Sequence, residues 1–494
     1  MMFKPFRTGL VSALALAGAV TAAQADGSLT VAMQLEPPHL DPTSAAAAAI
    51  DSVLYSNVYE GLTRFASDGS IVPGLARSWD ISEDGLTYTF HLAEGVTFHD
   101  GSAFDAEDVK FSLDRARADD STNAQKGLFA AIDTVEVTDP LTVVVTLSKP
   151  TGNFLFNMAW GDAVIVAPES ADTLQTTPNG TGAFKFADWV QGDRIELVKN
   201  PEYWGTPAEL DEATFKFISD PTAAFAAVMA EDVDVFYSFP APENLPQFDM
   251  DPRFKVLAGS TEGETILAMN NKLAPLDDVR VREAVAHAIN RQEIIDGAMF
   301  GYGTPIGSFF PPHNPDYVDL TGLSDYDPEK SKALLEEAGV ALPLRLKMTL
   351  PPPSYARRGG EIIAAQLRQV GIEAQIENVE WAQWLETTFR GKDYGLTIVS
   401  HVEPMDIGSL ANPEYYTQYD NPDFRAVIEE LSVTADQAAR SELFKQAQTT
   451  LAEDYVAGFL FQMALLTVAK AEVEGLWVNM PTPAVDLTSV HWAK

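Results

Sequence analysis

The chain has 494 residues, 46% hydrophobic and 21% charged, with 33 basic against 71 acidic side chains and a formal net charge of −38. A surface this acidic repels nucleic acid and anionic lipid, and the absence of cysteine excludes disulfide bonds, thiolate metal sites and cysteine nucleophiles. The length exceeds the roughly 250 to 300 residues that one hydrophobic core usually serves, so we expect two or more lobes.

The first 25 residues have the layout of a secretory signal peptide. Lys4 and Arg7 precede an uncharged apolar stretch at 9–23, and the small-x-small triplet Ala23-Gln24-Ala25 stands just before Asp26. The apolar stretch is short and interrupted for a bilayer span, and a lipoprotein anchor would need a cysteine. We therefore predict export to the periplasm with cleavage after Ala25.

Strand patterns dominate the first half of the chain. Two segments of alternating hydrophobicity, Leu75–Ser82 and Leu86–Leu92, flank Glu83-Asp84-Gly85, and Asp-Gly between such runs is a strong hairpin signal. Further strands are predicted at 134–138, 141–147 and 195–199. This half is expected to be rich in antiparallel strands.

Helix patterns mark the second half. Apolar residues recur at i, i+3, i+4, i+7 and i+8 within 278–299, which predicts one amphipathic helix capped by Asp277 or Asp278. A second helix is predicted between Asp327 as N-cap, followed by a proline, and Gly339 as a left-handed stop. The two helices imply that this half is built differently from the first.

A strand, a helix and a second strand follow at 344–350, about 358–370 and 372–376. This spacing is typical of a βαβ unit with a parallel strand pair. Together with the antiparallel first half, it predicts a mixed α/β architecture in two lobes.

The spacing of chemically active residues favours a binding protein over an enzyme. None of the seven histidines pairs with another at a metal-ligand spacing, and the glycines around Gly303 and Gly307 form no phosphate loop. The acidic pairs at 277–278 and 336–337 are explained by a helix cap and a solvated helix face. We expect no catalytic activity, no metal site and no cofactor.

Aromatic and polar residues gather in segments outside the predicted core. Sites for polar solutes are built from such aromatic walls and a few charged anchors, although each segment could equally be an ordinary loop or lobe edge. The segments are Tyr355-Ala-Arg357-Arg358, Trp381-Ala-Gln-Trp384, the run 400–406 and Tyr415-Tyr416.

Four stretches of the chain carry a family pattern. The longest, 73–112, contains Pro73-Gly-Leu-Ala-Arg-Ser-Trp79 and Gly95-Val-Thr-Phe-His-Asp-Gly101. The others are Asn179-Gly-Thr-Gly-Ala-Phe184 with Asn200-Pro-Glu-Tyr-Trp-Gly205, the run 269–291, and the run 326–339. Together and in this order, they resemble the solute-binding proteins of peptide, opine and nickel ABC importers, family 5, over about residues 29–480.

The resemblance implies an α/β, two-lobed periplasmic binding protein of type II. Lobe I would comprise 26–265 plus 468–494, with an extra subdomain at about 60–175, and lobe II would comprise 266–467. Crossovers near Leu267 and Val468 would act as hinges, so that the lobes close on the solute. The protein would act as a monomer, delivering a peptide, an opine or an oligosaccharide to the membrane permease subunits of an ABC importer.

The resemblance also suggests where the solute carboxylate binds. The segment at 355–361 is similar to the one in which dipeptide binders hold that carboxylate with an arginine, so Arg357 or Arg358 is the candidate clamp. The family's peptide binders further carry an aspartate for the ligand's amino group in a Trp-centred segment. The run 396–406 lacks that form and leaves Glu403 or Asp406 as substitutes.

This departure argues against simple dipeptide specificity and favours an opine, an oligosaccharide or another sugar-derived solute. Trp381 and Trp384 could stack on a sugar or a side chain, and Tyr415 is a further candidate for the site. Within the family, a nickel or metal-chelate binder is the alternative, for which His401 is the candidate ligand. A secreted hydrolase using two carboxylates is the alternative from another class.

Overall fold

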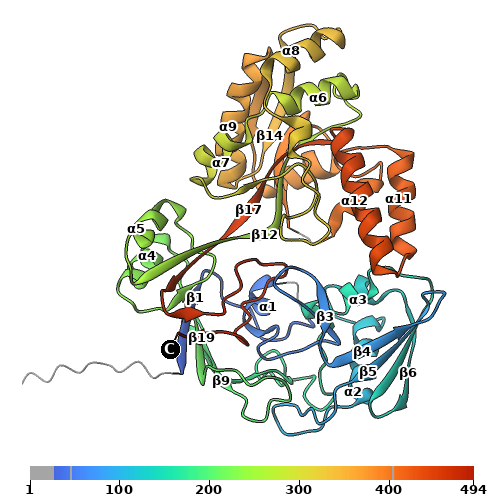
Figure 1. Cartoon of the computed structure of the whole chain (residues 1–494), viewed down its shortest axis with the longest axis vertical. Coiled ribbons are helices and arrows are strands. Elements are labelled where there is room, and N and C mark those ends of the chain that lie inside the picture. Colours follow the sequence, from blue (N-terminus) through green and yellow to red (C-terminus); the bar gives the residue numbers. More distant parts are fainter. Residues whose placement is uncertain (1–26, 45–46, 403–404, 494) are drawn as a thin grey trace, which may run out of the picture.

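The computed structural model describes residues 27–44, 47–402 and 405–493. The predicted signal peptide and Glu403 therefore lie outside the described residues. Figure 1 shows two bodies joined by two long strands, β12 (Phe254–Met269) and β17 (Ala457–Lys470). Within the described ranges no helix is long and apolar enough to span a bilayer.

The central element is an eleven-stranded mixed sheet that runs through both bodies. Its order is β15-β14-β16-β12-β17-β11-β1-β10-β9-β8, and β13 pairs with β17 off this path. The remaining strands of this sheet are β15 (Ile372–Asn378), β14 (Leu344–Leu350), β16 (Leu396–His401), β11 (Val235–Phe236), β1 (Ser28–Met33), β10 (Glu212–Phe217), β9 (Arg194–Lys199), β8 (Phe184–Val190) and β13 (Thr304–Pro305).

The parallel strands of the two bodies point toward each other. Since β12 enters the upper body and pairs antiparallel with β16, β16 and its parallel neighbours β14 and β15 end toward the lower body. Conversely, β11 pairs antiparallel with β17, so β11, β1 and β10 end toward the upper body. Two carboxyl edges of parallel strands therefore face one another across the β12–β17 connection.

The pairing of β12 changes partway along the strand. Residues 254–260 pair with β17 in the lower body, residues 264–268 pair with both β16 and β17 in the upper body, and the register shifts between Ser260 and Glu264. Leu267, one predicted crossover, pairs with Ile398 inside the upper body. Val468, the other, pairs with Phe236 inside the lower body.

A second sheet builds the extra part of the lower body, with the order β4-β5-β7-β6. The predicted hairpin is confirmed, because β4 pairs antiparallel with β5, and the strands predicted at 134–138 and 141–147 pair antiparallel as β6 and β7. Two small two-stranded sheets complete the strands. The bounds are β2 (Thr63–Phe65), β3 (Ile71–Pro73), β4 (Ala76–Ile81), β5 (Thr87–Leu92), β6 (Ile132–Asp139), β7 (Thr142–Leu147), β18 (Val473–Glu474) and β19 (His491–Trp492).

The helices cover both faces of the main sheet. They are α1 (Ala48–Leu54), α2 (Ala106–Arg117), α3 (Phe154–Asn157), α4 (Pro221–Met229), α5 (Leu245–Asp249), α6 (Val279–His287), α7 (Arg291–Met299), α8 (Pro328–Glu337), α9 (Ser354–Gln369), α10 (Trp381–Trp384), α11 (Pro422–Val433) and α12 (Gln437–Glu453). Short turns of helix include η2 (Gly161–Ala163), η5 (Leu385–Arg390) and η6 (Asp406–Ala411).

Local signals in the sequence explain most of these helices. Asp327 accepts hydrogen bonds from the first backbone amides of α8, and Gly339 beyond its end has φ +69°, as predicted. The single helix predicted over 278–299 is wrong. Asp278 does cap α6, but Asn290 accepts a hydrogen bond from the Glu293 amide and starts α7, so the chain turns between two helices.

Alternate residues of the upper sheet feed two separate cores, as a strand with both faces covered requires. Ile398 packs with Val281 and Ile363 of the helices on one face. Its neighbour Val399 packs on the other face with residues such as Phe424. The βαβ prediction is confirmed, because β14 and β15 are parallel and α9, which connects them, packs against the sheet.

Candidate functional site

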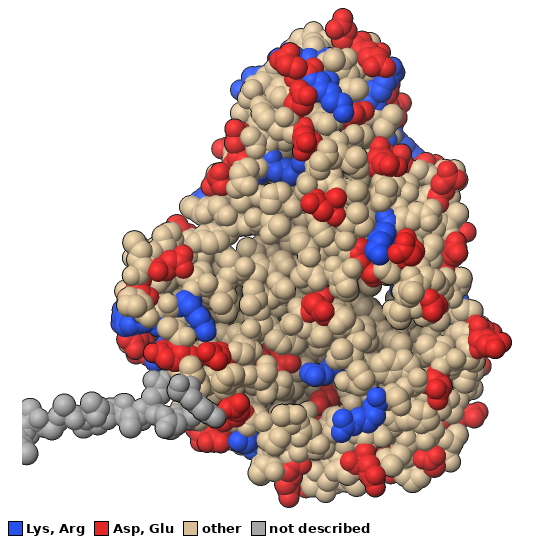
Figure 2. Space-filling view, viewed as in Figure 1, with Lys and Arg blue, Asp and Glu red and all other residues tan. Residues whose placement is uncertain are grey.

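The predicted site residues converge on one edge of the upper sheet. Arg357 follows β14, Trp381 follows β15, and Asp406 follows β16, so all three lie beyond the carboxyl ends of parallel strands. In open α/β sheets, ligands bind outside such ends. This edge faces the lower body, and Figure 2 shows a hollow in the middle of the visible face. Parallel pairing therefore joins segments that are distant in sequence.

His401 lies at the centre of this edge and is buried, with 6% exposure. Its Nδ1 is 2.7 Å from Asp406 Oδ2, and its Nε2 is 2.9 Å from the Tyr416 hydroxyl. Burial raises the pKa of Tyr416, so the hydroxyl stays protonated and donates to Nε2. Nδ1–H then donates to Asp406, which fixes both the tautomer and the position of the carboxylate.

His401 consequently has no free nitrogen for a metal ion. Within the described ranges, no group of three or more histidines, cysteines or acidic residues could hold one. The nickel or metal-chelate alternative stays a prediction.

Helix α9 is attached to this edge by Tyr355, whose hydroxyl oxygen accepts a 3.2 Å hydrogen bond from the Ser400 amide. The Ser400 hydroxyl is buried and has no hydrogen-bond partner. A buried polar atom without a partner costs free energy, about 1–3 kcal/mol. Ser400 is therefore a group that a polar solute could satisfy.

The two candidate arginines behave differently. Arg357 Nη2 donates to Glu380 Oε1 at 3.1 Å and to the Val379 carbonyl at 3.1 Å, while its Nε is buried without a partner. Arg358 is exposed and lies over the Phe300 ring, 5.3 Å from its centroid. Arg357 thus has an unused donor in a protected position, and Arg358 is engaged by an aromatic face.

The two tryptophans also separate. Trp384 is 4% exposed, donates its indole N–H to Thr397 Oγ1 at 3.0 Å and packs in the core, whereas Trp381 is 41% exposed and meets Trp384 edge-on. Trp384 is therefore occupied in the core, and Trp381 presents a free ring. Tyr415 is half-buried and packs edge-on against Tyr416.

A second histidine network lies at the register shift of β12 and was not predicted. His313 Nε2 is 2.8 Å from Glu262 Oε1, and His313 Nδ1 is 2.5 Å from Ser260 Oγ. Burial raises the pKa of Glu262, the His313 hydrogen bond lowers it, and the charge of Asp406 raises it again.

The only sequence signal for this network is Glu262 and Glu264, two residues apart in a largely apolar strand and so on one face. The trio has the members of a serine hydrolase triad, but Ser260 is buried at 8% exposure and its amide donates to Asn479 Oδ1 at 3.0 Å. The arrangement is that of a structural clasp. The hydrolase alternative, which would use two carboxylates, stays a prediction.

Comparison with known proteins identifies the family. Residues 70–421 match the profile of bacterial extracellular solute-binding proteins, family 5 Middle. The dipeptide-binding protein of Escherichia coli K12 is 30% identical over 462 residues, covering 83% of this chain and 84% of that protein. The chain therefore belongs to the family 5 extracellular solute-binding proteins.

Other relatives carry different solutes in their names. A glutathione-binding protein of Pectobacterium atrosepticum is 31% identical, with 90% of each chain covered, and the nickel-binding periplasmic protein of Escherichia coli K12 is 27% identical, with 96% of each chain covered. The structure of HbpA2 from Haemophilus parasuis superposes with a TM-score of 0.85 at 25% identity, covering 94% of this chain and all of that one. The two-lobed α/β fold expected from the sequence is thus confirmed.

Proposed function

We propose that this protein is the solute-capturing subunit of an ABC importer and encloses its solute between the two facing strand edges. The observation that carries the proposal is the arrangement of the parallel strands. β14, β15 and β16 end toward the lower body, and β1 and β10 end toward the upper one. A solute between them would contact loops from both bodies, so that binding would favour closure.

We propose further that the solute is small and carries a carboxylate, as a zwitterion or a sugar-linked acid. Arg357 would bind the carboxylate through its unsatisfied Nε, and Asp406 would receive an ammonium or hydroxyl group. Trp381 would stack on an apolar or sugar face. The dipeptide-binding and glutathione-binding relatives support a carboxylate-bearing solute.

The division into lobes follows the same proposal. Lobe I would comprise 26–265 plus 468–494, with the subdomain at about 60–175, and lobe II would comprise 266–467. The hinge in β12 would be the register shift between Ser260 and Glu264, because the strand loses its regular pairing there. The Glu262–His313 hydrogen bond at this point would hold the angle between the lobes.

Export and assembly complete the proposal. The amino-terminal 25 residues would be removed on secretion to the periplasm, and the mature chain would act as a monomer that docks on the permease subunits. Figure 2 shows acidic side chains spread over the whole visible face, which disfavours nucleic acid as a partner.

A thermal-shift screen tests this function. The mature protein is heated with dipeptides, tripeptides, opines, α-galactosides and Ni²⁺, and a solute at about 100 times its dissociation constant stabilises by about 2.7 kcal/mol. We expect one class of carboxylate-bearing solute to raise the midpoint temperature of unfolding. We also expect that solute to be recovered unchanged after incubation. Conversion of that solute into a product would overturn the assignment as a binding protein, and stabilisation by Ni²⁺ alone would overturn the solute class.

A further inference from the structure

A second concave site lies in lobe I, at the end of the sheet that points away from lobe II. It has a volume of about 550 Å³, and its lining includes the segment 203–209 before β10 and the residues 488–491. Trp492 donates its indole N–H to the Ser28 carbonyl at 3.0 Å, so this wall lies at the start of β1. Because β1 runs toward lobe II, the pocket is remote from the interlobe edge.

One wall of the pocket is fixed by a buried carboxylate. Glu60 accepts 2.8 Å hydrogen bonds from the Tyr203 hydroxyl, the Trp204 indole N–H and the Thr181 hydroxyl. Both carboxylate oxygens are therefore occupied, and burial raises the pKa of Glu60. The three donors hold Tyr203 and Trp204 in place, so the wall is preformed.

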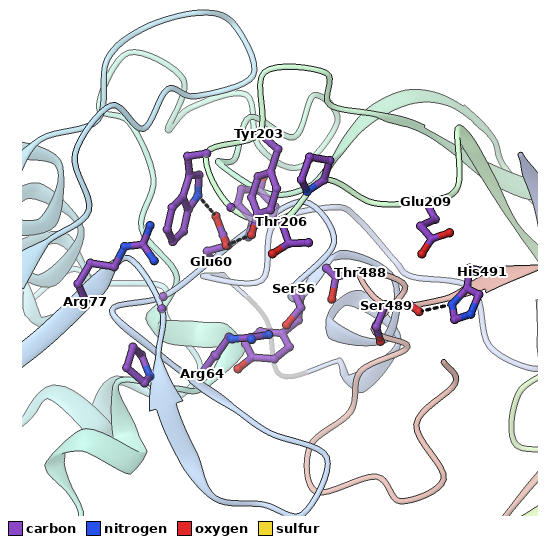
Figure 3. A pocket seen from close by; sticks show the side chains of 18 residues that line it. Ser56, Glu60, Arg64, Arg77, Tyr203, Thr206, Glu209, Thr488, Ser489 and His491 are labelled. Carbon is purple, nitrogen blue, oxygen red and sulfur yellow. Dashed lines mark hydrogen bonds between the residues drawn. The ribbon is translucent and has the colours of Figure 1, made fainter. Parts of the chain in front are cut away.

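Two arginines reach the same pocket from strands of two different sheets. Arg77 of β4 lies over the Trp204 ring, 4.5 Å from its centroid, and Arg64 of β2 is 45% exposed. Arg64 Nη1 is 3.9 Å from Asp486 Oδ2, a loose contact, and within the described ranges Arg77 has no ion pair with a carboxylate. Figure 3 shows both side chains at the pocket, with Glu60 beside Tyr203.

Arg64 and Arg77 thus meet at one pocket without a close ion pair to any described residue, in a chain with 71 acidic and 33 basic residues. Several other arginines are closely paired, as in the 2.7 Å contact of Arg253 with Asp251, whereas Arg358 stacks on an aromatic ring. Three hydroxyl residues also line the pocket: Thr488 and Ser489 donate to Asp486 Oδ1 and to the Gly475 carbonyl, and Thr206 is the third. Guanidinium groups and hydroxyls together are the donors that proteins use for oxyanions.

We propose that this lobe I pocket binds a small oxyanion, a carboxylate or a phosphate group, held between Arg64 and Arg77. The site is separate from the interlobe solute site and goes beyond the proposed function. The Trp204 ring, 4.5 Å from Arg77 Cζ, would help to hold the planar guanidinium at the pocket. The volume is that of a typical small-molecule site.

Calorimetric titration of the protein with inorganic phosphate and, separately, with succinate tests the proposal. We expect saturable binding of at least one of them, weakened at least tenfold in the double variant Arg64→Ala, Arg77→Ala. Binding of phosphate alone assigns a phosphate ligand, and binding of succinate alone assigns a carboxylate. Saturable binding of neither overturns the proposal.

A matched control removes the same charge elsewhere. The double variant Arg345→Ala, Arg390→Ala loses two exposed arginines that are paired with Glu373 and Glu386. We expect it to bind the anion like the parent protein; an equal loss in both double variants would show a general charge effect and overturn the site.

Folding and independence from the cleft need separate checks. The double variant Arg64→Lys, Arg77→Lys keeps the charge but loses the planar fork, so we expect intermediate anion affinity from a folded protein. The thermal shift produced by the interlobe solute should be unchanged in both lobe I variants. That readout separates failure of this proposal from failure of the proposed function.

Discussion

His313 and Glu262 are joined by a 2.8 Å hydrogen bond between Nε2 and Oε1, although 51 residues separate them in sequence. The other ring nitrogen of His313 meets Ser260, whose amide is bonded to Asn479 in the carboxyl-terminal segment. The network therefore ties the loop that carries His313 both to the register shift of β12 and to the carboxyl-terminal segment of the lower body.

Replacing His313 by alanine should loosen this connection. The substitution leaves the buried Glu262 carboxyl without its partner, so we expect the free energy of unfolding to fall by about 1–3 kcal/mol. We also expect a broader distribution of lobe angles, measured by small-angle scattering without solute. The matched control is His91→Ala, which removes a 2.9 Å contact with Asp80 at an exposed position and should cost less than about 1 kcal/mol. Equal losses in the two variants would argue against a clasp.

Arg357→Ala should weaken binding of the solute identified by the screen at least tenfold, equivalent to about 1.4 kcal/mol. The reason is loss of the protected Nε donor, whereas the ion pair with Glu380 is exposed and contributes little stability. Titration calorimetry measures the affinity, and thermal unfolding shows that the fold is retained. Arg358→Ala, which removes a guanidinium stacked on Phe300, should change affinity less than about threefold. If only Arg358→Ala weakens binding, the clamp is Arg358.

Substitution by alanine should affect stability at one tryptophan and solute binding at the other. Trp384→Ala removes a buried ring and the N–H bonded to Thr397, so we expect a loss of about 3–5 kcal/mol in unfolding free energy. Trp381→Ala removes a ring that is 41% exposed, so we expect stability close to the parent and weaker solute binding. Denaturant unfolding and titration calorimetry measure the two effects. A folded Trp381→Ala protein with parental affinity would remove this ring from the site.

Local chemistry in the sequence was enough to predict much of the fold. The Asp84-Gly85 turn and the Asp327 cap each determine a structure within a few residues, and both are present. The helix over 278–299 was mispredicted because the apolar pattern continues through Ala288 and Ile289. Capping by Asn290 outweighs that pattern. An apolar pattern reports which residues are buried, and two successive helices that pack on the same core can continue one pattern without forming one helix.

The candidate site, like the fold, was predictable only in part. Arg357, Trp381 and Asp406 follow β14, β15 and β16, and parallel pairing places the loops after these strands at one edge. Their role in binding stays a prediction. Which tryptophan faces the core was not predictable, since the two are the first and last residues of one short helix. The Glu262–His313 contact depends on a long-range approach that no local pattern encodes. Such contacts depend on tertiary packing and must be seen in the structure.

Two acids of the lower body, Asp51 and Asp162, make the free energy of unfolding depend on pH. Asp162 is 4% exposed, and burial and then the charge of Asp41 raise its pKa from 3.8 to about 7. Burial also raises the pKa of Asp51, and Asp162 adds to that shift. One carboxylate oxygen of each has no hydrogen-bond partner. The protonated forms are therefore the ones that the fold accommodates.

The sign follows from proton uptake. Between pH 3.8 and about 7, folded Asp162 holds a proton that the unfolded chain releases, so this stability is complete below that window and lost as pH rises through it. Asp162→Asn stays neutral, so its unfolding free energy relative to the parent should rise with pH and exceed the parent value by about 1 kcal/mol or more at pH 8. Urea unfolding across pH 5 to 8 measures this, with Asp188→Asn as the exposed control. A constant difference between Asp162→Asn and the parent would mean that Asp162 is ionised throughout, and that the lobe I core holds its charge.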